Sequence, residues 1–188
     1  SVNQAYHFLQ SALISKPELV QGHWLLAKIH GDKGNDGAAL HVLNRSLEVC
    51  DHRPETYQLM ADIYHRLNQP LLMHAALEKT VKYAPGQPEY RLTLAQYYAQ
   101  IHNYQKARDL CHELLDNSLA SLFRGRVTHT LGAIEAALAH PGTALRYLHQ
   151  ALSLRPEDPL VHYDLGLLYS KMERFADAAK HFYTCHRL

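Results

Sequence analysis

The stretch VHYDLGLLYSKMERFADAAKHF, residues 161–182, carries the pattern that decides the fold. Its small and apolar residues stand at fixed positions, which are Leu165, Gly166, Tyr169, Ala178 and Phe182. The Leu-Gly pair recurs towards the N-terminus in steps of 34, 37, 34 and 34 residues, as Leu131-Gly132, Leu94-Ala95, Met60-Ala61 and Leu26-Ala27. The stretch is therefore one copy of a unit that is repeated along the chain.

Each unit consists of two runs of about 12–14 residues, which is a common length for helices, and no sustained alternation of period two predicts a strand. Turn residues separate the two runs at Gly31–Gly37, Asn68–Pro70 and His140–Thr143. Prolines fall between the units, at Pro17, Pro85 and Pro156. Because one helix pair cannot bury its apolar face alone, we predict an all-α fold in which neighbouring pairs stack.

This pattern resembles the tetratricopeptide repeat family, whose signature is W-x2-L-G-x2-Y, then A-x3-F, then P, on a 34-residue period. The resemblance covers essentially the whole chain and implies a right-handed superhelical solenoid of antiparallel helix pairs in a single domain, 1–188. The expected units are a leading half repeat at 1–18 and full repeats at about 20–53, 54–87, 88–124, 125–158 and 159–188.

Two features of the chain depart from a regular array. The step of 37 places three extra residues near 116–123, where we expect a longer turn or an extended helix. The chain also begins in the middle of a repeat and without a methionine, so we expect it to be a fragment of a longer protein. Whether that longer protein carries a catalytic, targeting or membrane segment outside residues 1–188 is left open by the sequence.

Composition argues against several classes of partner. The net charge of +1, counted with the 15 histidines neutral, offers no basic field for nucleic acid. No apolar run is long enough to insert into a membrane. The three cysteines, Cys50, Cys111 and Cys185, are odd in number and far apart, which argues against a disulfide framework and favours a reducing compartment such as the cytoplasm.

No constellation in the sequence predicts catalysis. The segment GDKGNDG, residues 31–37, lacks the Lys-Ser/Thr of a phosphate loop and the ligand spacing of a calcium loop, so it is interpreted as a turn. In Cys111-His112 and Cys185-His186 the neighbouring side chains point about 100° apart on a helix, which excludes a thiol–imidazole dyad. We expect no catalytic residue, no metal site and no cofactor.

The resemblance implies that the first helices of the repeats line a concave groove that receives a peptide or a partner helix. Projecting that geometry selects Gln21, Trp24, Lys28, Gln58, Asp62, His65, Leu92, Gln96, Arg126, His129, Tyr163 and Leu167. Trp24 can be a core residue or a stacking anchor in this groove. A clamp for a terminal carboxylate is not expected, because Lys28 is the one base at the matching positions and Glu89 would repel the ligand.

The sequence therefore predicts a non-catalytic scaffold for protein–protein interaction, with a protein or peptide as its partner. Two alternatives remain open. The first is a docking or regulatory region of a larger enzyme, for example a glycosyl- or sulfotransferase. The second is a structural protein that forms homo-oligomers by stacking the apolar ends of its repeat array.

Overall fold

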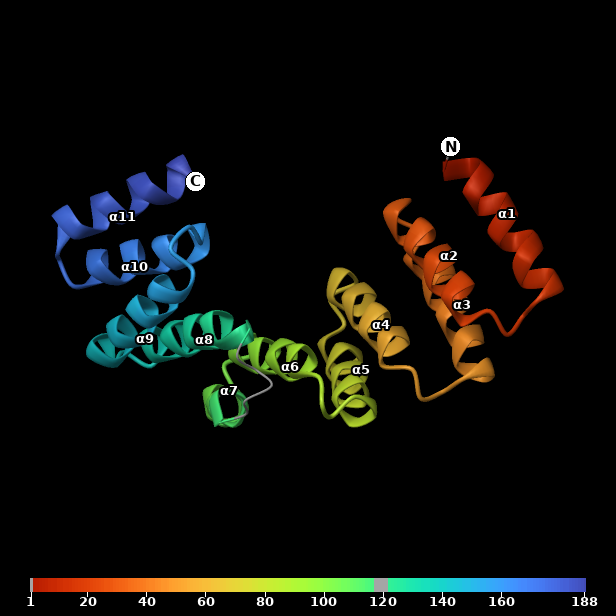
Figure 1. The fold of residues 1–188 in the computed structure, drawn as a ribbon, viewed down its shortest axis with the longest axis horizontal. Coiled ribbons are helices and arrows are strands. Elements are labelled where there is room, and N and C mark those ends of the chain that lie inside the picture. The colour runs from red at the N-terminus through yellow and green to blue at the C-terminus, as the bar shows by residue number, and fades with distance from the viewer. Residues whose placement is uncertain (1, 117–121) are drawn as a thin grey trace. The chain divides into compact units, whose positions relative to one another are not determined.

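The computed structural model of the chain describes residues 2–116 and 122–188. These residues form eleven α-helices and no strand (Figure 1). They fall into two compact units, Ser1–Gly86 and Gln87–Leu188, which we call unit 1 and unit 2 and describe separately. The predicted all-α fold is confirmed, while the continuation of a single domain across Gly86 stays a prediction.

Unit 1 contains five helices: α1 (Val2–Ser15), α2 (Val20–Asp32), α3 (Asp36–Val49), α4 (Pro54–Arg66) and α5 (Pro70–Tyr83). Unit 2 contains six: α6 (Pro88–Gln100), α7 (Tyr104–Asp116), α8 (Arg124–Ala137), α9 (Pro141–Leu154), α10 (Pro159–Lys171) and α11 (Phe175–Arg187). Each predicted repeat is one antiparallel pair, from α2/α3 to α10/α11, and α1 is the leading half repeat. Within each unit the first helices of successive pairs also contact one another, α2 with α4, α6 with α8, and α8 with α10.

Prolines set many of the helix boundaries. Five helices, α4, α5, α6, α9 and α10, begin with proline, whose fixed φ suits the first helical position and whose missing N–H has no partner there anyway. Pro17, Pro85 and Pro156 each follow the last residue of a helix by two positions, as the sequence indicated.

The two helices of a pair pack closely because one of them carries a small residue at the contact. A Cβ atom on Gly132 of α8 would lie 2.7 Å from Cγ of Leu148 and 3.2 Å from the backbone nitrogen of the same residue. A Cβ on Gly166 of α10 would lie 2.6 Å from Cε1 of Phe182. Ala27, Ala61 and Ala95 occupy this place in the other pairs, and all three are buried. The recurring small residue of the sequence pattern thus marks the point where the helices touch.

The turn inside each pair has the same backbone form. One residue in each is left-handed, with φ between 53° and 73°; these are Gly34, Asn68, His102, Ala139 and Glu173. The N–H of the next residue then donates to a carbonyl five positions back, as from Asn35 to His30 (2.9 Å) and from His140 to Glu135 (2.9 Å). This Schellman arrangement ends the first helix and reverses the chain within three residues. The glycine, asparagine and proline signals revealed three of these turns, whereas His102 and Glu173 gave no such signal.

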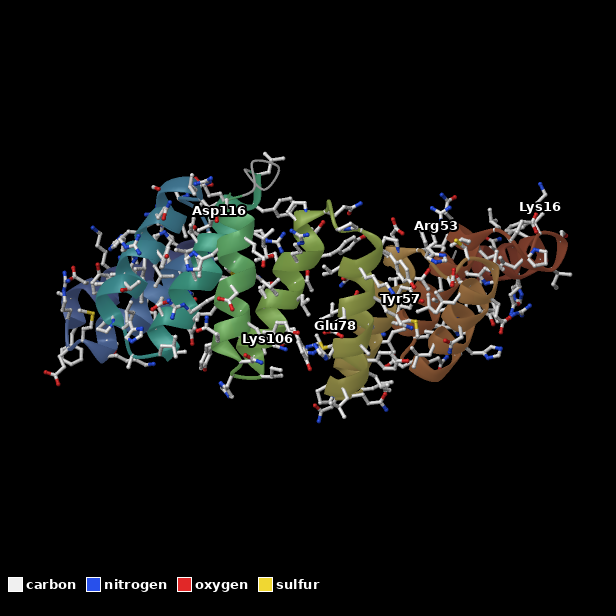
Figure 2. The ribbon with its side chains drawn as sticks, turned by 90° about the horizontal axis from the view of Figure 1, so that it is seen from below. Lys16, Arg53, Tyr57, Glu78, Lys106 and Asp116 are labelled. Atoms are coloured by element: carbon white, nitrogen blue, oxygen red, sulfur yellow. The ribbon has the colours of Figure 1, made fainter. Side chains whose placement is uncertain are left out.

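The expected irregularity near 116–123 falls mostly on residues 117–121, which lie outside the described residues. On either side of them α7 and α8 are tied together. The guanidinium of Arg124 donates to the carbonyl of Leu115 (3.2 Å), and Nε of Arg108 on α7 forms an ion pair with the buried carboxylate of Glu135 on α8 (3.2 Å). Figure 2 marks the two ends of α7 by Lys106 and Asp116.

The contact at Gly132 predicts an unequal response to adding a methyl group. Gly132→Ala should destabilise the protein, because Leu148 is fully buried and its backbone cannot yield, and overpacking costs about 1–3 kcal/mol against a gain of up to about 1 kcal/mol in helix propensity. Gly166→Ala should cost less, because Phe182 is only partly buried and its ring can turn. Urea unfolding followed by circular dichroism measures both, and equal stability of Gly132→Ala and the wild type would contradict this account.

The left-handed turns predict a stabilising change. Ala139→Gly should raise the free energy of unfolding by about 0.5–1 kcal/mol, because a left-handed conformation is costly for a residue with a Cβ atom and free for glycine. The matched control is Ala133→Gly, at an exposed position in the middle of α8, which should lower stability by about 1 kcal/mol. Thermal melts of the two variants should therefore move in opposite directions.

Candidate partner-binding surface

The first helices of unit 1, α2 and α4, enclose a cavity of about 420 Å³. Charged side chains of both signs line it, namely Lys28, Asp32, Asp62 and Arg66, above apolar Leu59 and Ile63. Lys28 and Asp62 belong to the predicted surface, while Asp32 and Arg66 were missed. The spacing of Asp62 and Arg66, four residues apart on one helix, is the signal that could have found Arg66, because such residues share a helix face.

Asp62 is the polar centre of this cavity. Partial burial raises the pKa of its carboxyl above the usual 3.8, while the Nε2 of Gln58, which donates to Oδ1 at 3.1 Å, and nearby Arg66 oppose the shift. Arg66 is itself engaged, because its Nε donates to Oδ1 of Asp36 on α3 at 3.2 Å. The structure thus places Gln58, Asp62 and Lys28 close together, and the side chain of Asp62 is exposed.

Trp24 contributes to the contact between two repeats. Its Nε1–H donates to Oγ1 of Thr56, a fully buried residue at the start of α4, at 2.7 Å. The indole is half-buried, and with Gln21 and Arg53 it lines a second hollow of about 210 Å³. Trp24 is therefore partly a structural link between α2 and α4 and partly an exposed surface. His65 is exposed on the last turn of α4.

In unit 2, polar side chains bridge the first helices of successive pairs. Arg126 of α8 lies 3.8 Å from the carboxylate of Glu89 on α6. Nε2 of Gln96 donates weakly to Oγ1 of Thr130 at 3.5 Å, and Nε2 of His129 lies 2.7 Å from Oδ2 of Asp164 on α10. Three predicted residues, Gln96, Arg126 and His129, thus lie on one surface and hold neighbouring repeats in register.

An apolar row lies on α10 beside these bridges. Leu160, Tyr163 and Leu167 are 64%, 48% and 40% exposed, and their spacing places them on one face of the helix. The ring of Tyr163 meets Phe182 of α11 edge-on, with ring centroids 6.0 Å apart. Tyr163 and Leu167 are therefore open to solvent, as expected for residues that contact a partner, and the aromatic contact restrains Tyr163.

Leu92 requires a correction. It was assigned to the partner surface, but its side chain is 0% exposed and belongs to a core cluster with Leu114 of α7 and Val127 of α8. Both of those helices pack on this turn of α6, so no partner reaches Leu92. The sequence itself indicates that Leu92 is buried, because it is the one aliphatic residue at this position of the repeat. The corresponding residues of the other repeats are Trp24, Gln58, His129 and Tyr163.

Over residues 2–116 and 122–188, no three His, Cys, Asp or Glu side chains gather closely enough to hold a metal ion. Cys111 is fully buried, and desolvation raises the pKa of its thiol to about 12, so it is unreactive at neutral pH. None of the described helices is long and apolar enough to cross a bilayer.

The raised pKa of Asp62 predicts how stability depends on pH. The folded protein binds a proton at Asp62 more tightly than the unfolded chain does, so the ionised carboxylate disfavours the fold at neutral pH. Asp62→Asn keeps an acceptor for Gln58 and should raise the melting temperature at pH 7. The difference from the wild type should disappear as the pH falls below about 3.8, where Asp62 is protonated in both states. A lower melting temperature of Asp62→Asn at pH 7 would refute this.

Comparison with known proteins agrees with the repeat architecture. Residues 130–184 match a family model described as tetratricopeptide repeat, and no curated protein matches the sequence. Among solved structures, PilW, described as a widely conserved type IV pilus biogenesis factor, superposes with a TM-score of 0.79 at 14% identity, covering 90% of this chain and 77% of that chain. PilF of Pseudomonas aeruginosa gives 0.76 at 17% identity, covering 92% and 78%.

A third similar structure is YrrB, described as a tetratricopeptide repeat protein with an unusual peptide-binding site. Its TM-score is 0.69 at 13% identity, covering 94% of this chain and 90% of that chain. At these identities the structures show a shared fold. The family match over residues 130–184, the shared fold and the repeated helix pairs all agree with the resemblance of this chain to the tetratricopeptide repeat family.

Proposed function

We propose that this region is a non-catalytic interaction module that binds a segment of a partner protein along the first helices of its repeats. The observation that carries the proposal is the row of Leu160, Tyr163 and Leu167 on α10, which is apolar and open to solvent. Monomeric proteins seldom leave ordered aromatic and aliphatic side chains exposed in a row, so such a row commonly marks a binding surface. The proposal involves no catalytic step and retains the cytoplasm as the expected compartment.

The polar bridges support this use of the surface. The pairs Arg126–Glu89 and His129–Asp164 restrain side chains that would otherwise lose rotamer freedom when a partner binds. A surface that is already ordered gives up less entropy on association and therefore binds more tightly for the same contacts. The remaining hydrogen-bonding capacity of these groups lies beside the apolar row, where it can meet the polar backbone of a partner segment.

Unit 1 offers the same combination on a smaller scale. Asp62 lines a cavity together with apolar Leu59 and Ile63, and partial desolvation raises the pKa of its carboxyl. A partner that supplies an N–H group or a positive charge would replace that lost hydration. The description of YrrB as a protein with a peptide-binding site gives the fold a precedent for receiving such a segment.

A capture experiment tests the proposal at α10. Wild-type protein, the double variant Tyr163→Ala/Leu167→Ala, and a control are immobilised, and proteins retained from the native source are compared by quantitative mass spectrometry. The double variant should retain its principal partner at least about tenfold less well, because aromatic and aliphatic anchors carry a large share of interface energy. Isothermal calorimetry with the purified partner then gives the ratio of affinities.

The matched control is Tyr183→Ala, which removes an exposed tyrosine from α11 without touching the apolar row. Both variants should keep a melting temperature close to that of the wild type, because none of the three side chains is buried. Equal loss of binding in the control, or unchanged binding in the double variant, would refute the assignment of this surface.

A further inference from the structure

Unit 1 contains a second pocket, separate from the surface of the first helices. It lies between α1, α2 and α3, has a volume of about 660 Å³, and shares no lining residue with the cavity around Asp62. Because α1 and α3 are the second helices of their repeats, this pocket is lined largely by second helices, whereas the cavity around Asp62 is lined by first helices. It falls within the 300–1,000 Å³ typical of ligand pockets.

The floor of the pocket is apolar. Leu13 of α1, Leu26 of α2 and Val42 of α3 meet there, and each is almost completely buried. At the rim, the side chain of Ile14 on α1 is 82% exposed, so no described residue of the chain covers it. A partner side chain inserted above this floor would cover Ile14 as well, and would remove apolar surface from water on both molecules.

The polar groups of the pocket are all basic or neutral. They include Arg45 and the imidazoles of His23, His30 and His41, and the lining described by the structure includes no Asp or Glu. His23 is already used, because its Nε2 bonds to the carbonyl of Pro17 at 2.9 Å. Nδ1 of His30, in contrast, is buried with no hydrogen-bond partner among the described residues. The cavity around Asp62 differs in having two carboxylates among its lining residues.

Two residues that line the pocket differ from their counterparts in the next repeat. His23 and His30 occupy the places that Tyr57 and Tyr64 occupy one repeat later, 34 residues along the chain. In that repeat Tyr57, labelled in Figure 2, is buried and stacks on Tyr83 with ring centroids 5.6 Å apart. An imidazole is shorter than a phenol and fills less of the space between the helices. The first full repeat thus carries imidazoles where the next repeat carries phenols, and His30 packs edge-on against the ring of Tyr6.

We propose that this pocket binds an acidic, apolar segment of a partner protein, at a site independent of the first-helix surface. An aliphatic or aromatic side chain of the segment occupies the floor of Leu13, Leu26 and Val42. A neighbouring carboxylate pairs with Arg45, whose guanidinium is suited to carboxylates. The net charge of the chain is only +1, so the preference for an acidic segment arises from this local arrangement and not from a general positive field.

Selection from a random peptide library tests the proposal, because it does not require the natural partner to be identified. Twelve-residue peptides displayed on phage are selected on the wild-type protein and counter-selected on Arg45→Glu. Recovered peptides should be enriched in Asp and Glu next to Leu, Ile or Phe. Fluorescence anisotropy with synthetic copies should give a dissociation constant at least tenfold weaker for Arg45→Glu than for the wild type.

Two further variants separate the pocket from general effects of charge and from the first-helix surface. Lys79→Glu makes the same change of charge at the equivalent exposed place of the next repeat and should alter affinity less than twofold. Ala38→Trp adds an indole at an exposed position in the pocket wall, leaves the charge unchanged and should block binding. Circular dichroism melts establish that each variant is folded.

Each outcome decides the question. Failure to recover peptides after counter-selection, recovery of basic or neutral peptides, or equal sensitivity to Arg45→Glu and Lys79→Glu would overturn the proposal. Peptides that lose affinity in Tyr163→Ala/Leu167→Ala but not in Ala38→Trp would also overturn it, because they bind the first-helix surface. That last result would leave the proposed function intact, and loss of binding in Ala38→Trp alone would support the second site.

Discussion

The fold depends on the closeness with which the two helices of each repeat approach one another. A residue with little or no side chain on the first helix faces a larger residue sixteen positions later, as Gly132 faces Leu148 and Gly166 faces Phe182. Interiors of proteins are packed as densely as organic crystals, so this single spacing fixes how the pair fits. The turn between the helices follows from the same constraint, because the chain must reverse within three residues, and a left-handed residue allows that. The packing of the two helices at the small residue therefore also fixes the orientation of the exposed side chains on the first helix.

The repeated contact is also what made the fold predictable. Gly166, Ala178 and their counterparts recur every 34 residues with one exception of 37, and this near-constant interval specifies helix length, pairing and the inward face. The left-handed turns at His102 and Glu173 were not predictable in the same way. Glu173 carries no preference for that conformation, and the enrichment of histidine in it is too weak to mark His102 as a turn residue.

The candidate surface was predictable only in part, because projecting a helical pattern gives the direction of a side chain and not what covers it. Tyr163 and Leu167 are open because no second layer of described residues lies over that side of α10 in unit 2. Leu92 has the same position in its repeat as Tyr163 but is covered by α7 and α8.

The sequence also did not show which side chains form hydrogen bonds between neighbouring repeats. The contacts of Trp24 with Thr56 and of His129 with Asp164 join residues 32 and 35 positions apart, and many side chains of either repeat could have formed them.

Glu135 limits how freely the repeats can be exchanged. At its place the other repeats carry His30, Tyr64, Tyr98 and Tyr169. Here a buried carboxylate takes its counter-charge from Arg108 in the preceding repeat, and Nδ1 of His140 in its own turn lies 2.9 Å from it. A buried ion that loses its partner costs about 3–5 kcal/mol. Duplicating, deleting or transplanting this repeat by recombination would therefore carry a penalty unless its upstream neighbour moved with it. The pairs α6/α7 and α8/α9 should therefore be kept together when the repeats are recombined.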